Sequence, residues 1–421
     1  MATGIADFGA VGRAFGNRNY AIYTAGSTVA MVGLWVQRLG VGWLAWELTY
    51  SGFWLGAIAF ADLFPAVVIG PFAGVLADRM DRLRLARACQ WLSLAQTGLL
   101  FVLMVWSHID IVSLMLLTLF LGCVRAVYMP VRLSLVPALV RPDDVPAAIA
   151  ISSMIFNLAR FVGPAAAGLI IARWGVAPTF AFYGVTVVVL LIAFSRLRID
   201  RVPPGAGRGG GMLAQIAEGL RYTASHGAIA PLFLLMLGLS VLARPVGELF
   251  PGFADLVFQR GAVGLAWLSS AIGLGAVAGG LWLARRGSAV GLLPIALAGA
   301  GVSGGSLILF TGTDIFPIAI PAIGLFGAAV VSCAIATQTL LLSAVEDHMR
   351  GRVLSLYGVI FRGGPAVGSL LMGGLSDLFG LRWPMAVGGV LCLVAAIWAW
   401  RGRRRMEVVL EVRTGRRSGL D

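Results

Sequence analysis

The sequence predicts an all-α polytopic membrane protein, with twelve transmembrane helices in two pseudo-symmetric six-helix halves. Three features support this fold class: the composition, the spacing of the apolar segments, and motifs that occur twice. Of the 421 residues, 59% are hydrophobic and only 12% are charged, and the mean hydropathy is +0.91. Because a soluble domain carries about 25% charged residues, this composition indicates a chain that lies mostly within a bilayer.

The twelve helices are predicted from runs of apolar residues. A helix that crosses the hydrocarbon core needs about 20 predominantly apolar residues. Twelve segments are of suitable length, at roughly 20–46, 53–77, 86–106, 111–135, 147–172, 178–195, 229–250, 263–284, 289–311, 315–343, 353–376 and 383–400. The first is too long for a signal peptide, so we expect an uncleaved helix.

The distribution of positive charge predicts the orientation. All 32 basic residues are arginine. If the N-terminus is inside, only Arg173, Arg260 and Arg382 fall in outer loops. Since cytoplasmic loops of membrane proteins are enriched in basic residues, both termini are predicted to be cytoplasmic. The same distribution accounts for the net charge of +13, and we expect no nucleic-acid partner.

The longest polar stretch divides the segments six and six. The predicted parts are a first half at 1–195, a cytoplasmic linker at 196–227, a second half at 228–400 and a basic cytoplasmic tail at 401–421. The linker is rich in proline and glycine, which disfavour regular structure. Near its end, apolar residues of 213–220 share one helical face, which predicts an amphipathic helix on the inner membrane surface.

Two motifs recur at nearly the same spacing, which indicates a duplicated six-helix unit. Gly74–Arg79 has a counterpart 206 residues later at Gly280–Arg285. Arg160–Pro164 in the fifth segment has a counterpart at Arg362–Pro365 in the eleventh. In the later copy of the first motif, Ala284 replaces the aspartate, so only the first copy is expected to take part in conformational switching.

The first motif carries a family resemblance. The pattern G-x-L-A-D-R-x-x-R-x-R, with Gly74, Asp78, Arg79 and Arg82, follows the second apolar segment and resembles the signature loop of the major facilitator superfamily. The resemblance implies a secondary transporter in which Asp78 acts as a latch on the N-terminus of the eleventh helix, near Gly351. The alternative is that these charged side chains only anchor the loop among lipid headgroups.

The fifth segment contains Asn157, Arg160, Gly163, Pro164 and Gly168. Glycines beside a proline allow a helix to bend and to approach a neighbour closely. This segment resembles the superfamily's antiporter motif, and the wider string resembles the branch of the enterobactin exporter and bacterial transmembrane secretion effectors. That branch implies proton-coupled export, by alternating access, of a small siderophore-like or drug-like amphipathic molecule. It also implies a monomer in the bacterial inner membrane.

Polar residues within the apolar segments are the candidates for the proton and substrate pathway. A charge at the centre of a transmembrane helix costs about 2.5–3.5 kcal/mol on insertion scales and is usually functional. The candidates are Asp62, Arg125, Asn157, Arg160, Arg244, Glu248 and Arg362.

Among these candidates, Asp62 is the preferred proton carrier, because it is the one carboxylate well inside a span of the first half. Glu248 ranks second because Arg244, one helical turn away, can pair with it. Alternatively, this pair is structural or gates the pathway and does not contact substrate. Alternatively, Arg160 and Arg362 donate hydrogen bonds to backbone carbonyls that the Gly-Pro bends leave without a helical partner. Arg125 departs from the family pattern, in which the arginine precedes the glycine of the fourth helix. In the seventh helix, Pro245 is expected to cause a kink.

Other features of the sequence say less about function. The tryptophans at positions 35, 43, 46 and 54 are interpreted as an interfacial belt. The four cysteines lie in predicted spans without paired spacing, and the three histidines are isolated, so we expect no disulfide framework, metal or cofactor. No nucleotide-binding or nucleophile motif is present, so an ATP-driven pump or an enzyme is not expected. The remaining alternatives are uptake or lipid flipping on the same fold, or a non-transporting membrane scaffold.

Overall fold

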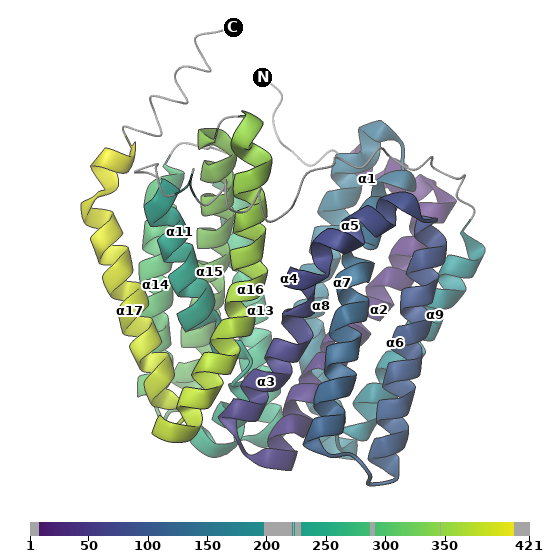
Figure 1. Ribbon diagram of the computed structural model, residues 1–421, viewed down its shortest axis with the longest axis horizontal. Coiled ribbons are helices and arrows are strands. Elements are labelled where there is room, and N and C mark those ends of the chain that lie inside the picture. Colours follow the sequence, from purple (N-terminus) through teal and green to yellow (C-terminus); the bar gives the residue numbers. More distant parts are fainter. Residues whose placement is uncertain are drawn as a thin grey trace, which may run out of the picture. The chain divides into compact units, whose positions relative to one another are not determined.

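The computed structural model describes residues 8–197, 221, 223, 229–286, 291–345 and 347–407. All regular elements of these residues are helices (Figure 1). The predicted amphipathic helix at 213–220 and most of the linker and tail lie outside the described residues.

The chain divides into two compact units that do not coincide with the two predicted halves. Unit 1 takes in the described residues of Met1–Tyr50, Ala57–Arg208 and Gln259–Ser270. Unit 2 takes in those of Ser51–Gly56, Gly209–Phe258 and Ala271–Asp421. Each unit therefore includes a short segment that belongs, by its position in the sequence, to the other six-helix half.

Besides the second span and part of α13 (Gly261–Arg286), the described part of unit 1 contains six α-helices, three of which begin at polar caps. They are α1 (Phe8–Gly16), α2 (Arg18–Thr49), α6 (Arg82–Val105), α7 (Ile111–Ala138), α8 (Val145–Trp174) and α9 (Ala177–Arg196). Asn17, Asp81 and Asp110 accept hydrogen bonds from the first-turn amides of α2, α6 and α7, which are otherwise without helical partners. α2 packs against both α8 and α9.

The second predicted span, at 53–77, is not one helix. It consists of α3 (Gly52–Leu63), α4 (Pro65–Val68) and α5 (Gly70–Arg79). A proline lies in the first turn of both α4 and α5, and proline lacks the N–H that would continue the preceding helix. The prediction of one continuous helix was wrong here because it followed hydrophobicity and gave no weight to the two prolines.

Unit 2 contains the seventh and the ninth to twelfth segments and most of the eighth, and the seventh segment is irregular. α11 (Ile229–Gly238) continues as a π-helical stretch at Leu239–Ala243, a 3-10 turn at Arg244–Gly247, α12 (Phe250–Gly252) and a second π-helical stretch at Phe253–Val257. The change in helix type around Pro245 agrees with the predicted kink.

The other helices of unit 2 are long. They are α13 (Gly261–Arg286, shared with unit 1), α14 (Leu292–Gly312), α15 (Phe316–Ala344), α16 (Asp347–Phe379) and α17 (Arg382–Arg401). α14 contacts both α15 and α17, and in Figure 1 these helices run side by side. α13 approaches α15 very closely, because a Cβ on Gly275 would lie 1.8 Å from the carbonyl oxygen of Gly324.

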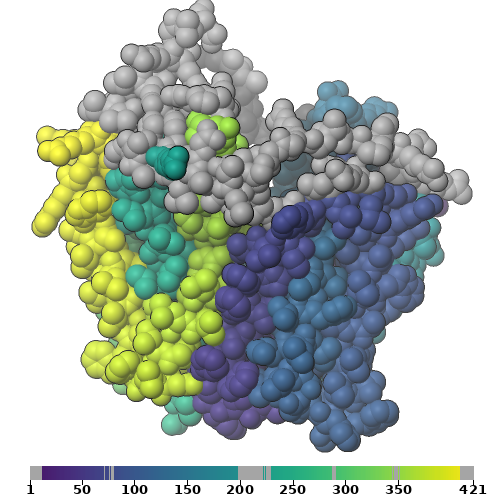
Figure 2. Space-filling view, viewed as in Figure 1, coloured from purple at the N-terminus to yellow at the C-terminus, as the bar shows by residue number. Residues whose placement is uncertain are grey.

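The described helices account for the twelve predicted crossings. Eleven are long and apolar enough to cross a membrane, and the shorter apolar stretch Gly52–Val68 is the interrupted second span. α6 and α7 form part of the surface seen in Figure 2, and they carry exposed apolar side chains such as Leu99 and Leu116. Such a surface suits contact with lipid, and the chain is a multi-pass membrane protein.

Candidate functional site

The candidate site in unit 1 is an ion-pair cluster centred on Asp62, in the last turn of α3. One carboxylate oxygen, Oδ1, accepts a hydrogen bond from Nη1 of Arg125 at 2.5 Å. The other, Oδ2, lies 3.8 Å from Nη1 of Arg38 on α2. The Asp62 side chain is only 11% exposed. One carboxylate is therefore held between two guanidinium groups within membrane-spanning helices.

Close packing of α7 on α3 brings Asp62 and Arg125 together. Gly122 lies one turn before Arg125, and a Cβ there would lie 2.6 Å from the carbonyl oxygen of Ala61. The same Cβ would lie 3.0 Å from the carbonyl oxygen of Asp62. The absence of a side chain at Gly122 therefore allows the approach, and residues three or four apart share a helix face, so Arg125 points toward α3 as well.

An aromatic residue joins this ion pair to a second predicted candidate. The guanidinium carbon of Arg38 lies 5.5 Å from the centre of the Trp35 ring, and that of Arg160 lies 5.9 Å from the same ring. These distances fall within the range of cation–π attraction. A Cβ on Gly163 would lie 2.4 Å from Cβ of Trp35, so Gly163 lets α8 pack on α2 at this point.

The structure thus groups three predicted residues with two that sequence reasoning assigned no role at the site. Asp62, Arg125 and Arg160 were candidates, whereas Arg38 was not among them. Trp35 was assigned to the interfacial belt, and the structure instead places it in half-buried contact with the arginines. The only signal for Arg38 was its charge within the first apolar segment.

Some buried polar atoms of the cluster, and of Gln37 beside it in the sequence, have no hydrogen-bond partner. Gln37, next to Arg38, donates from Nε2 to Oε1 of Gln96 at 3.2 Å. Among the described residues, Oε1 of Gln37, Nε of Arg125 and Nε1 of Trp35 are buried without a hydrogen-bond partner. Since unpaired polar atoms are costly in a membrane interior, the site is suited to a polar ligand group or water.

The remaining predicted residues of α8 face different partners. The side chain of Asn157 is half-buried, and its amide donates to the carbonyl oxygen of Ser153 in its own helix at 2.9 Å. Pro164 lies inside α8, which nevertheless remains α-helical. A Cβ on Gly168 would lie 2.2 Å from Cβ of Ala266, in the part of α13 that belongs to unit 1.

In unit 2, Arg244 makes a structural contact. Its Nη1 donates to the carbonyl oxygen of Phe361 at 2.7 Å, and its guanidinium carbon lies 4.2 Å from the Phe361 ring. In a regular α-helix this carbonyl would accept a hydrogen bond from the backbone amide of residue 365. That residue is Pro365, which has no N–H. Arg244 therefore donates to the carbonyl freed by the proline, a role that the sequence suggested for Arg362, which is exposed. Glu248 is half-buried at the end of the 3-10 turn.

In the signature loop, Gly74, Asp78 and Arg79 lie in the last turns of α5, and the side chains of Asp78 and Arg79 are outside the described part. Arg82 begins α6, and its Nη1 donates to the carbonyl oxygen of Ser134 on α7 at 3.4 Å. The loop is thus attached to α7. The contact predicted between Asp78 and the eleventh helix stays a prediction.

A hydrogen-bonded contact of a carboxylate, absent from the sequence-based candidates, joins the start of α3 to α16 in unit 2. Oδ1 of Asp377 accepts from the backbone N–H of Gly52 at 2.6 Å, and Oδ2 accepts from Oγ of Ser51 at 2.6 Å. The backbones are close here too, because a Cβ on Gly56 would lie 2.1 Å from the carbonyl oxygen of Ser369. The one sequence signal was Ser51 as an N-cap. We call this contact of Asp377 with Ser51 and Gly52 the α3–α16 clamp.

Several curated proteins are similar to this chain. The staphyloferrin A transporter of Staphylococcus aureus is 25% identical over 396 residues, 92% of this chain and 97% of the relative. The enterobactin exporter EntS of Escherichia coli is 25% identical over 360 residues, 83% of each chain. Macrolide efflux protein A of Streptococcus pyogenes is 23% identical over 399 residues, 91% of this chain and 96% of the relative.

Solved structures share the fold at low sequence identity. A bacterial homologue of the human lysosomal transporter Spinster, inward-facing and unoccupied, has a TM-score of 0.70 at 16% identity and covers 92% of this chain and 98% of its own. A variant of the peptide transporter POT in complex with sulfate has a TM-score of 0.72 at 14% identity, with coverages of 91% and 95%.

The family comparison agrees with the fold and with the motifs. The family model described as transmembrane secretion effector matches residues 14–410, nearly the whole chain. A transporter of this kind has a small-molecule substrate and works in a membrane. The chain therefore belongs to the transmembrane secretion effector family and is a transporter of the major facilitator type.

Proposed function

We propose that this chain is a proton-coupled exporter of small amphipathic molecules that works by alternating access as a monomer in the bacterial inner membrane. The observation that carries the proposal is Asp62 held between Arg125 and Arg38 inside membrane-spanning helices. Intramembrane charges of this kind mark proton and substrate pathways in transporters. Both termini are placed in the cytoplasm, because arginines concentrate in the segments that would then be inside.

Coupling follows from competition for one carboxylate. In the absence of substrate, Arg125 and Arg38 compensate the buried charge of Asp62. A substrate that presents a hydrogen-bond donor or a cation can take one side of the carboxylate, and its apolar part can pack on the Trp35 ring. A proton bound to Asp62 removes the charge that attracts the donor. Proton and substrate therefore exclude each other, as exchange of an outgoing substrate for protons that enter down their gradient requires.

The substrate class rests on the relatives. Their names refer to staphyloferrin A, enterobactin and macrolides. Siderophores and macrolides are amphipathic molecules rich in hydrogen-bonding groups. The site offers the Trp35 ring beside Arg38 and Arg160, and the Asp62 carboxylate between Arg38 and Arg125. We propose a substrate of this siderophore-like or drug-like type.

The test uses inverted membrane vesicles, into which an exporter moves its substrate. Enterobactin, staphyloferrin A and a macrolide are each offered with and without an imposed pH gradient. Wild-type protein should accumulate at least one of them in response to the gradient. Asp62→Asn, whose side chain is neutral like the protonated carboxyl group, should bind that compound measurably but more weakly and should no longer respond to the gradient, whereas Glu248→Gln, the matched control in unit 2, should keep both properties. A gradient response that survives Asp62→Asn contradicts the assignment of the proton site.

Alternating access also needs a switch on the cytoplasmic side, and we assign it to Asp78. A carboxylate near a helix N-terminus gains about 0.3–1 kcal/mol from the helix dipole. Asp78→Asn should therefore leave the protein folded and slow transport strongly, while Arg79→Gln should slow it less. Wild-type turnover in a well-expressed Asp78→Asn protein would leave only the anchoring role for the loop.

A further inference from the structure

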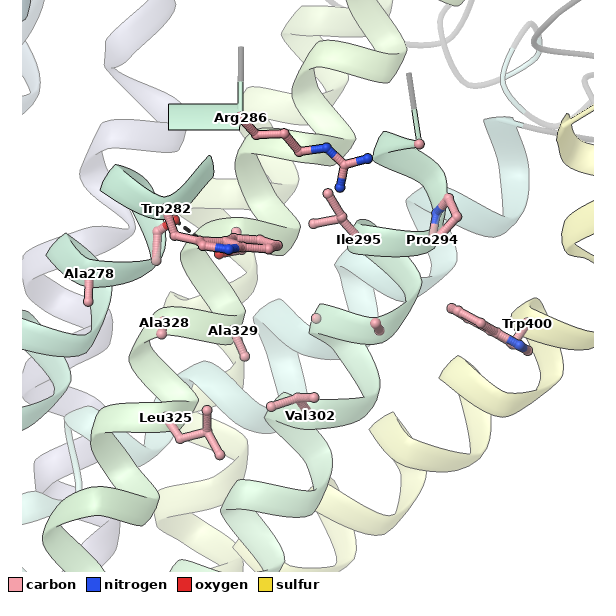
Figure 3. Close-up of a pocket in the computed structure, with 15 residues that line it drawn as sticks. Ala278, Trp282, Arg286, Pro294, Ile295, Val302, Leu325, Ala328, Ala329 and Trp400 are labelled. Atoms are coloured by element: carbon pink, nitrogen blue, oxygen red, sulfur yellow. Dashed lines mark hydrogen bonds between the residues drawn. The ribbon is translucent and has the colours of Figure 1, made fainter. Parts of the chain in front are cut away.

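A lateral groove in unit 2, separate from the Asp62 cluster, has the features of a lipid site. It has a volume of about 680 Å³ and is lined by residues of α13, α14, α15 and α17 (Figure 3). This volume lies in the range of about 300–1,000 Å³ that is typical of ligand pockets. We propose that the groove binds one anionic phospholipid, with the acyl chain in the groove and the phosphate at Arg286.

The floor of the groove is made by closely packed helices with small side chains. A Cβ on Gly279 of α13 would lie 2.4 Å from the carbonyl oxygen of Ala328 on α15. A Cβ on Gly299 of α14 would lie 3.0 Å from the carbonyl oxygen of Ala329. Because these helices meet at their backbones, larger neighbouring side chains stand out on either side, and an apolar trough remains between them.

The walls of the groove face the bilayer and not the interior of the unit. The side chains of Trp282, Leu325 and Val302 line it and are 55%, 52% and 41% exposed. In Figure 3, Trp282 and Trp400 lie on opposite sides of the groove. A surface of this kind is reached from the lipid, and tryptophan is enriched at the level of the headgroups.

Positive charge is concentrated at one end of the groove. Arg286 lies there, with its Nη2 2.7 Å from the position of a Cβ on Gly291, so the glycine leaves room for the guanidinium group. The guanidinium carbon of Arg403 lies 4.6 Å from the centre of the Trp400 ring. The residues of the described chain that line the groove include no acidic side chain. Two cations beside an apolar trough complement a phosphate that carries an acyl chain.

The length of the groove fits one leaflet. Arg286 and Ala278 mark its extent along α13 (Figure 3), and eight residues of helix span about 12 Å at about 1.5 Å per residue. One leaflet contributes about half of the roughly 30 Å hydrocarbon core. The lipid would belong to the inner leaflet, a placement that rests on the proposed orientation of the termini.

Native mass spectrometry of the purified full-length protein tests the headgroup contact. The delipidated protein is titrated with phosphatidylglycerol and, separately, with phosphatidylcholine. Wild-type protein should retain phosphatidylglycerol preferentially, and Arg286→Gln should weaken that retention by about fivefold, the factor expected for one basic residue at a membrane surface. Arg285→Gln is the matched control, because the adjacent arginine does not line the groove, and it should bind as wild type does.

A second pair of variants tests the acyl-chain contact independently of charge. Ala298→Phe places a ring in the groove from an exposed position on α14, and it should reduce retention of both lipids. Trp400→Ala should also reduce retention, whereas Trp398→Ala, two residues away and outside the lining, should not. Glycerol phosphate, which has no acyl chain, should not compete with phosphatidylglycerol.

Three results would overturn the proposal. Equal losses in Arg285→Gln and Arg286→Gln would mean that the basic surface as a whole attracts the lipid. Full competition by glycerol phosphate would identify a site for soluble phosphates. Unchanged retention in Ala298→Phe would show that the acyl chain lies elsewhere. None of these results bears on the Asp62 site, so this proposal and the proposed function fail separately.

Discussion

The α3–α16 clamp should control how readily α3 separates from α16, and Asp377→Asn tests this. In the proposed alternating-access cycle, this contact would have to open and reform. The Asp377 carboxylate accepts two hydrogen bonds of 2.6 Å, one from the Ser51 hydroxyl and one from the Gly52 amide. Asparagine has one acceptor oxygen in place of two, so the variant keeps one of these bonds and loses the other together with the charge.

The size of the effect follows from the exposure of the two bonds. A hydrogen bond to a charged group contributes about 1.5–3 kcal/mol. The bond to Ser51 is exposed and the bond to Gly52 is part-buried, so the lower end applies, about 1.5 kcal/mol. A difference of about 1.4 kcal/mol changes an equilibrium constant about tenfold. Asp377→Asn should therefore raise the fraction of molecules with an open clamp by about tenfold.

Thiol labelling measures this fraction. Ser369 is fully buried beneath the close approach of Gly56, so a Ser369→Cys reporter, in a background without the four native cysteines, reacts only when α3 moves away. The reporter should react with maleimide about tenfold faster in Asp377→Asn, the same factor as the change in equilibrium. Asp314→Asn is the control, because Asp314 is another exposed carboxylate of unit 2 and pairs with Arg382 instead.

Two outcomes would refute the reasoning about the clamp. The first is a wild-type labelling rate in Asp377→Asn. The second is an equal acceleration in Asp314→Asn, which would mean that any loss of charge at this end loosens the unit. A double-mutant cycle with Ser51→Ala adds a stricter requirement, since the two substitutions remove one shared hydrogen bond and should be clearly non-additive.

Three further outcomes are expected. Arg125→Gln removes the shorter ion pair of Asp62. It should lower the free energy of unfolding by about 2 kcal/mol, less than the roughly 3–5 kcal/mol lost when a fully buried pair is broken. In thermal unfolding, the double variant with Asp62→Asn should recover part of this loss. Gly275→Ala should lower the unfolding temperature through a collision costing about 1–3 kcal/mol, whereas Gly305→Ala, with nothing within 4 Å of the added Cβ, should not. A cysteine replacing Ile109 should react with an impermeant reagent from outside intact cells and a cysteine in the linker should not; the reverse pattern would overturn the proposed orientation.

The number and order of the membrane segments were predictable because each depends only on local hydrophobicity. α9 and α17 begin and end within a residue or two of the predicted bounds. The interrupted second span was also readable in principle, since Pro65 and Pro71 lie within the apolar run. The π-helical stretch at Leu239–Ala243 was not, because it packs against α16 and α17, and these contacts between helices cannot be read from the sequence.

The candidate site shows a different limit of sequence reasoning. Asp62 was ranked above Glu248 because an arginine lies one turn from Glu248 in the same helix. The structure gives Asp62 two arginine neighbours, one of them Arg125, 63 residues away in the sequence. Pairs within a helix follow from spacing, whereas pairs between helices require knowledge of which faces meet. The absence of a cationic neighbour therefore no longer supports Asp62 as the proton carrier.

The case for Asp62 now rests on competition instead. A carboxylate without a cationic partner could change its charge freely, but nothing would link that change to the positions of the surrounding helices. Asp62 on α3 is bound by arginines on α7 and α2, so a proton on Asp62 weakens contacts between three helices at once. Gly122, which allows α7 to reach α3, should then matter for coupling as much as the charges do. Gly122→Ala would separate these helices while every charge remains, and it should uncouple transport from the pH gradient as Asp62→Asn does; coupling that persists in Gly122→Ala would mean that the ion pair does not transmit protonation to the helices.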